Sequence, residues 1–103
     1  MLKMAATLNI SLCQYKLGQY GDTIGILTEI VKQDDECVKA YYRMGQAWFQ
    51  LQEYRNSRLN YEKALSLDDS LSGAKKAIAE CKKLEREQEL ADREKYKGMF
   101  GKK

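Results

Sequence analysis

Hydrogen-bond donors recur at helical spacing in two stretches of this 103-residue chain. Asn9 and Lys16 lie seven residues apart, which places both side chains on one face of a helix. Lys39, Arg43 and Gln46 share a face in the same way in a second stretch, and neither face carries an acidic residue. Such a donor set predicts an anion site, and its geometry favours a carboxylate over the edge of a nucleic-acid base. The alternative is an ordinary solvated surface, where most lysines lie.

Groups that could carry out catalysis are scarce. Histidine is absent, which removes the commonest general base and the commonest metal ligand. The three cysteines, Cys13, Cys37 and Cys81, are widely spaced and form no paired metal motif. We expect them to be reduced thiols of a cytoplasmic protein, with Cys13 and Cys81 as small residues in helix contacts. The sequence therefore predicts a chain that is not an enzyme and uses no metal or cofactor.

The composition also excludes several classes of partner. The chain is 44% hydrophobic and 32% charged, which is typical of a globular protein. It has no apolar run near the roughly 18 residues that a membrane span requires. Residues 72–103 hold ten basic and six acidic residues, a charge of +4, which outweighs the −1 of the rest of the chain and gives the net charge of +3. Because the signs are mixed and no recognition motif is present, we expect neither nucleic acid nor a membrane as partner.

The elements that must position these donors are indicated by an internal period of 34 residues. Small residues recur at this offset in three columns, and an apolar column (Ile10, Met44, Ile78) runs between them. The small columns are Ala6, Ala40 and Ala74; Ser11, Gly45 and Ala79; and Cys13, Ala47 and Cys81. Small residues at fixed positions suit helices that approach closely, and a period of 34 is typical of tetratricopeptide-type helical hairpins.

This pattern predicts an all-α fold with helices over residues 2–17, 20–32, 37–51, 54–67 and 70–98. The expected units are two helical hairpins, 1–37 and 38–71, and a C-terminal helix within 72–103, all in one domain. Gly18 should end the first helix in a left-handed conformation. The Asp pairs at 34–35 and 68–69 suit the start of the following helices, where Ser70 or Ser72 is a further cap. Gly98 or Gly101 should end the last helix.

With Gly45, Tyr54 and Ala64 in its second unit, the chain resembles the tetratricopeptide repeat (TPR) family. The string LNISLCQYKLGQY, followed by VKAYYRMGQA and the tail DREKYKGMFGKK, resembles more specifically the C-terminal TPR part of the large FKBP-type immunophilins. These are peptidyl-prolyl isomerase co-chaperones. The resemblance covers nearly the whole chain and implies a protein-interaction module whose isomerase domain would lie elsewhere.

The resemblance also implies a partner. In this family the groove is a dicarboxylate clamp for the C-terminal Glu-Glu-Val-Asp of heat-shock chaperones of the 90-kDa and 70-kDa classes. Carried over, Asn9 would hold the terminal carboxylate, Lys39 and Arg43 would grip side-chain carboxylates, and Lys16 would add a contact. Gln46, Tyr42 and Phe49 are candidates for an upstream apolar residue, although core packing also suits the aromatics.

Three further expectations follow from the resemblance. The clamp of this family also uses a Lys and an Asn from an earlier repeat, so we expect an incomplete clamp with weakened affinity. Without that repeat, Met1, Met4, Leu8 and Leu12 would be exposed on the first helix and would favour a homodimer. Calmodulin binding near residues 96–103 is a weaker expectation than a solvated tail. The alternative function is a non-catalytic tail of a prolyl isomerase that serves as a scaffold or dimerisation module.

Overall fold

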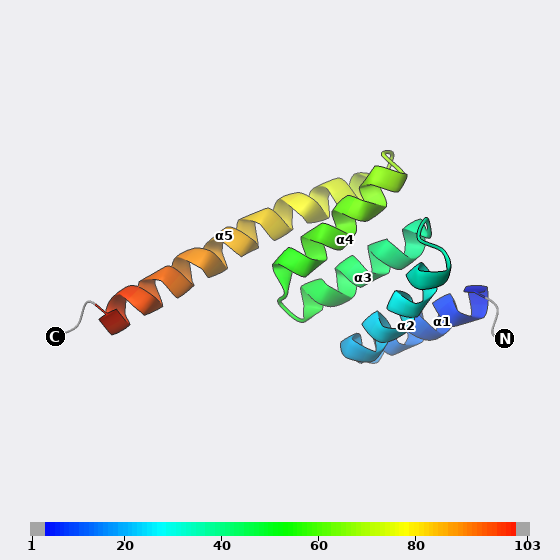
Figure 1. Ribbon diagram of the computed structural model, residues 1–103, viewed down its shortest axis with the longest axis horizontal. Coiled ribbons are helices and arrows are strands. Elements are labelled where there is room, and N and C mark those ends of the chain that lie inside the picture. Colours follow the sequence, from blue (N-terminus) through cyan, green and yellow to red (C-terminus); the bar gives the residue numbers. More distant parts are fainter. Residues whose placement is uncertain (1–3, 101–103) are drawn as a thin grey trace.

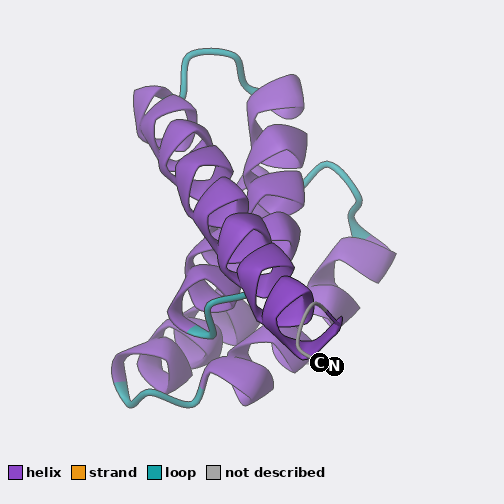
Figure 2. Cartoon of the chain, turned by 90° about the vertical axis from the view of Figure 1, so that its left-hand side faces the viewer, coloured by secondary structure: helices purple, strands orange, loops and turns teal. Residues whose placement is uncertain are grey.

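Five helices form the computed structural model, which describes residues 4–100 and the side chains of residues 6–97. They are α1 (Met4–Lys16), α2 (Tyr20–Gln33), α3 (Val38–Gln50), α4 (Tyr54–Leu67) and α5 (Ser72–Phe100). Figure 1 shows two antiparallel hairpins, α1–α2 and α3–α4, with α5 packed along α4. Within the described range there is no strand, as the side view in Figure 2 also shows. The predicted all-α fold of two hairpins and a long last helix is confirmed.

The turn inside each hairpin repeats with the 34-residue period. Gly18 has a φ of +80°, and its N–H and that of Gln19 return to the carbonyls of Tyr15 and Gln14. Gln52, at the equivalent position, has a φ of 62° and closes the same type of turn. This pair of bonds is the Schellman arrangement, so the left-handed end predicted at Gly18 is confirmed. Gln52 adopts this left-handed conformation although it is unfavourable for a residue that has a Cβ.

The turns between hairpins differ from the prediction. Asp34 and Asp68 are the C-caps of α2 and α4, and their carboxylates accept N–H bonds from Glu36 and Ser70. They close local turns and do not cap the next helix, because each carboxylate reaches only two residues ahead. The last helix begins at Ser72 and continues through Gly98 to Phe100, so the predicted end at Gly98 is wrong. Gly101 lies outside the described residues.

The small-residue columns mark close contacts between helices. A Cβ on Gly45 would lie 2.9 Å from Cγ of Tyr61, so α3 and α4 meet at bare backbone. Hydroxyls occupy equivalent positions in both hairpins: Ser57 Oγ donates to the Gly45 carbonyl (2.6 Å), whereas Thr23 Oγ1 donates to the Gln19 carbonyl (2.8 Å) and lies 3.5 Å from that of Ser11. The α3–α4 hairpin is therefore closed by a buried side-chain hydrogen bond as well as by apolar contact.

The core has two parts. Leu27, Ile30, Ala40 and Met44 join α2 to α3, whereas Tyr61, Ala74, Ile78 and Cys81 join α4 to α5. Leu8 is half-buried against the first cluster and Leu12 is also half-buried. The prediction that they are exposed is wrong, because both lie on the side of α1 that faces its neighbours. The side chains of Met1 and Met4 lie outside the described residues.

An ion pair and a hydrogen bond fix the middle of α5. Arg58 of α4 donates to both carboxylate oxygens of Glu85, at 2.6 and 3.1 Å, and Gln88 donates to the carbonyl of Gln52. Beyond Gln88, residues 89–97 are exposed, and α5 projects past the tip of the α3–α4 hairpin (Figure 1). None of the helices within the described range has the length and apolar character needed to cross a membrane. The segment predicted to bind calmodulin extends beyond the described side chains.

Candidate functional site

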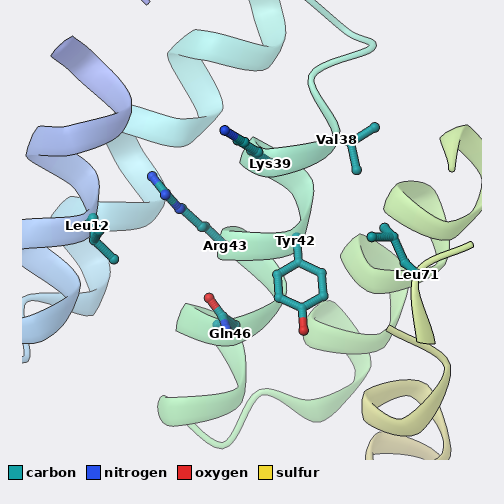
Figure 3. A pocket seen from close by; sticks show the side chains of 7 residues that line it. All are labelled: Leu12, Val38, Lys39, Tyr42, Arg43, Gln46 and Leu71. Atoms are coloured by element: carbon teal, nitrogen blue, oxygen red, sulfur yellow. The ribbon is translucent and has the colours of Figure 1, made fainter. Parts of the chain in front are cut away.

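A cavity of about 400 Å³ lies on α3 where the helix faces α1 and the start of α5. Its polar lining comes from Lys39, Arg43 and Gln46, three successive positions on one face of α3. The remaining walls are Leu12, Val38, Tyr42 and Leu71. Figure 3 shows these seven side chains, with Arg43 reaching toward α1. Two cations, one amide and mostly apolar walls have the chemistry that suits an anionic group attached to an apolar chain.

Arg43 is held in place by α1. Its Nη1 donates a 2.8 Å hydrogen bond to the carbonyl of Leu8, thirty-five residues away in the sequence. A guanidinium carries five N–H donors, so this bond leaves most of its fork for a ligand. The contact fixes the orientation of the side chain before a ligand arrives, which lowers the ordering cost of binding.

Tyr42 forms a rigid wall of the cavity. Its ring packs edge-to-face on Tyr61 with centroids 5.3 Å apart, and a Cβ on Gly73 would lie 2.6 Å from its hydroxyl oxygen. The missing side chain at Gly73 therefore leaves room for the phenol at the start of α5. Burial raises the pKa of Tyr61 well above its ordinary value, so the supporting ring stays neutral. Phe49 instead packs on the second core cluster and on Tyr54.

The two donors of α1 lie outside the cavity lining. Asn9 and Lys16 are exposed on α1, whereas Leu12 is the residue of α1 that lines the cavity. Asn9 directly follows Leu8, whose carbonyl accepts the Arg43 bond. At the other end of α1, Gln50 donates to the hydroxyl of Tyr15 across the two helices. The structure thus groups Lys39, Arg43 and Gln46 and leaves Asn9 and Lys16 outside that group.

Sequence reasoning missed several residues of the site. Leu71 lines the cavity from the turn before α5, a position that helical spacing on α3 does not mark. Val38 is the first residue of α3 and lies four residues before Tyr42, so spacing along α3 could have found it. The bond from Arg43 to Leu8 depends on how α1 and α3 pack and leaves no signal in the sequence. The hydroxyl at Ser57 could have been noticed in the sequence, because Thr23 supplies a hydroxyl at the equivalent position 34 residues earlier.

The fold is that of a TPR domain. The first TPR domain of the human RPAP3 protein superimposes with a TM-score of 0.77 at 21% identity, over 82% of this chain and 66% of that one. The translocator chaperone SycD of Yersinia enterocolitica gives a TM-score of 0.76 at 19% identity, over 85% of this chain and 59% of that one. The chain is therefore a helical repeat protein of the TPR class.

Within this class, the homologues of the chain are FKBP-type proteins. The peptidyl-prolyl cis-trans isomerase FKBP4 of Mus musculus is 27% identical over 99 residues, 96% of this chain. The FK506-binding protein 59 of Drosophila melanogaster is 27% identical over 101 residues, 98% of this chain. The chain spans only 22% and 23% of these two relatives. No family model matches the sequence.

Proposed function

We propose that this chain is a protein-interaction module of an immunophilin-like co-chaperone. Its ligand would be the acidic C-terminal peptide of heat-shock chaperones of the 90-kDa or 70-kDa class, bound in the cytoplasm. The α3 cavity is the site, with Lys39 and Arg43 gripping carboxylates and Gln46 donating its amide. Asn9 and Lys16 would contact the peptide where it leaves the cavity along α1. The chain would act as a binding module without catalytic groups.

One observation carries this proposal: two cations line one mostly apolar cavity that contains no acidic side chain. A carboxylate that enters this cavity meets two positively charged donors, and no acidic side chain of the lining neutralises them. Charge-assisted hydrogen bonds contribute roughly 1.5–3 kcal/mol each. The apolar walls Leu12, Tyr42 and Leu71 suit an aliphatic side chain of the same peptide.

Lys39→Ala is the direct test. We expect the wild-type chain to bind a Glu-Glu-Val-Asp peptide with a dissociation constant of about 0.1–1 mM. Loss of the Lys39 ammonium should weaken binding about fivefold to tenfold, because the contact is charge-assisted but solvent-exposed. Isothermal titration calorimetry measures both constants. Lys83→Ala, which removes an exposed lysine of α5, is the matched control and should change binding less than twofold. Equal binding by all three proteins contradicts the proposed site.

Arg43→Ala requires a second readout. The substitution removes a candidate ligand donor and also the bond to the Leu8 carbonyl that joins α3 to α1. We therefore expect weaker peptide binding together with a loss of about 1 kcal/mol in the free energy of unfolding.

The second candidate function is a scaffold or dimerisation module. It is favoured by the outer face of α1, where apolar side chains are exposed. This face is separate from the Leu12 side that lines the cavity.

A further inference from the structure

Gly73, the second residue of α5, lies against the phenol of Tyr42, which is a wall of the α3 cavity. A Cβ added at Gly73 would lie 2.6 Å from the Tyr42 hydroxyl oxygen, too close for two atoms that are not bonded. The next nearest atoms are Cζ and Cε2 of the same ring, at 3.6 and 3.8 Å, which are ordinary contact distances. Of the three nearest atoms, the hydroxyl oxygen alone therefore requires the missing side chain.

The local structure gives no other reason for glycine at this position. The backbone of Gly73 does not have a positive φ, and glycine is a poorer helix former than alanine. Gly73 is exposed, whereas its neighbour Ala74 is the residue buried in the second core cluster. One period earlier the equivalent residue is Lys39, so the repeat itself does not demand a small residue here. The glycine is explained by its contact with Tyr42.

A side chain at Gly73 would move the phenol toward the cavity. The hydroxyl would have to retreat by roughly 1 Å to reach an ordinary contact distance. The Tyr42 ring already packs edge-to-face on the buried Tyr61, which closes that side. The open side is the cavity, which Tyr42 lines together with Val38 and Leu71 (Figure 3). Because the hydroxyl is the outer end of a half-buried side chain, this shift narrows the cavity and disturbs the fold little.

We propose that Gly73 is a positioning residue that sets the specificity of the cavity. It leaves room for the Tyr42 phenol at the start of α5 and so keeps the cavity wide enough for a branched aliphatic side chain of the acidic peptide. The inference rests on the proposed function, because that peptide is the ligand. Gly73 acts through Tyr42 on the apolar part of the ligand, whereas Lys39 and Arg43 serve its carboxylates.

Two peptides with free C-termini, Glu-Glu-Val-Asp and Glu-Glu-Ala-Asp, test this proposal in NMR titrations of the full chain. The wild type should bind the valine peptide about threefold to tenfold more tightly, because the cavity removes two further carbon atoms from water. In Gly73→Ala this valine preference should fall to about 1.5-fold or less, since the displaced phenol fills the space. The affinity for the alanine peptide should change less than about twofold, because the charge-assisted contacts remain.

Tyr42→Phe provides a rescue that a merely structural role of Gly73 would not show. Without the hydroxyl, the nearest ring atom lies 3.6 Å from the added Cβ. The double variant Tyr42→Phe, Gly73→Ala should therefore have the same valine preference as Tyr42→Phe alone. Gly25→Ala is the matched control, because no atom lies within 4 Å of its added Cβ on α2, and its valine preference should equal that of the wild type. Circular dichroism checks that each variant is folded.

Each other outcome overturns the proposal in a recognisable way. A valine preference that survives Gly73→Ala, or is absent from the wild type, removes the role of Gly73 and leaves the carboxylate site standing, since both peptides still bind. A preference that Gly73→Ala abolishes in the Tyr42→Phe background as well, or that Gly25→Ala also abolishes, shows an effect that does not pass through the phenol. Unfolding of Gly73→Ala would assign the glycine to stability. Binding of neither peptide by the wild type contradicts the proposed function itself, and the specificity role falls with it.

Discussion

Gly45 and Gly25 lie inside helices in opposite surroundings. A Cβ at Gly45 would meet the ring of the buried Tyr61 at 2.9 to 3.0 Å. At Gly25 nothing lies within 4 Å of an added Cβ. Gly45 is therefore required by the approach of two helices, whereas Gly25 only loosens α2, since glycine is a poor helix former.

Alanine at these two positions should have opposite effects. Gly45→Ala should lower the free energy of unfolding by about 1–3 kcal/mol, because the Tyr61 ring or α4 must shift. Gly25→Ala should raise it by about 0.5–1 kcal/mol through helix propensity. Urea denaturation followed by circular dichroism measures both values. A neutral Gly45→Ala would show that the α3–α4 contact is looser than the structure indicates.

At the scale of single elements, the strongest polar contact of α5 is the pairing of Glu85 with Arg58 of α4, beside the second core cluster. Arg58 donates to both oxygens of Glu85, and this hydrogen-bonded pairing lowers the pKa of the Glu85 carboxyl. A carboxyl whose pKa is lower in the folded state stabilises the fold above its ordinary pKa. That stabilisation is lost as the pH falls through the folded-state value.

Glu85→Gln should therefore destabilise the protein by roughly 0.5–1.5 kcal/mol at pH 7. The difference from wild type should shrink as the pH falls below the ordinary pKa of a glutamate and through the lower pKa of Glu85 in the folded state, where the wild-type carboxyl becomes protonated too. Thermal unfolding from pH 3 to pH 7 measures this difference. Asp68, whose pKa is lowered by hydrogen bonds from Ser70, adds an acid dependence common to both proteins. Glu87→Gln, on the exposed part of α5, is the control. If it destabilised the protein as much as Glu85→Gln, the role of the Arg58–Glu85 pair would be contradicted.

At the scale of the whole molecule, the 34-residue period made the fold predictable. Small residues such as Ala40 and Ala74 could be assigned to helix contacts because both recur in register, and both are fully buried. The grouping of Lys39, Arg43 and Gln46 followed from spacing within one helix. The position of Asn9 relative to them did not, because it depends on how α1 packs on α3. The exposure expected for Leu8 was wrong for the same reason.

Two truncations test how the molecule is divided. A chain ending at Gln88 keeps the second core cluster and the Gln88–Gln52 bond, and residues 89–97, which it loses, are all exposed. Its free energy of unfolding should stay within about 0.5 kcal/mol of the full chain. A chain ending at Leu71 leaves Tyr61 without Ala74, Ile78 and Cys81 and should lose cooperative unfolding. Denaturant titration distinguishes them, and a stable, cooperative shorter chain would contradict the assigned role of α5.

The most direct measurement of the central claim compares one acidic peptide in two chemical forms. Calorimetric titration with Glu-Glu-Val-Asp carrying a free C-terminus, and with the same peptide amidated, isolates the terminal carboxylate as the recognised group. We expect the amide to bind at least tenfold more weakly, and the affinity of the free acid to fall as salt is raised. Equal affinity for both forms of the peptide at low salt would contradict recognition of a chain-terminal carboxylate by the α3 cavity.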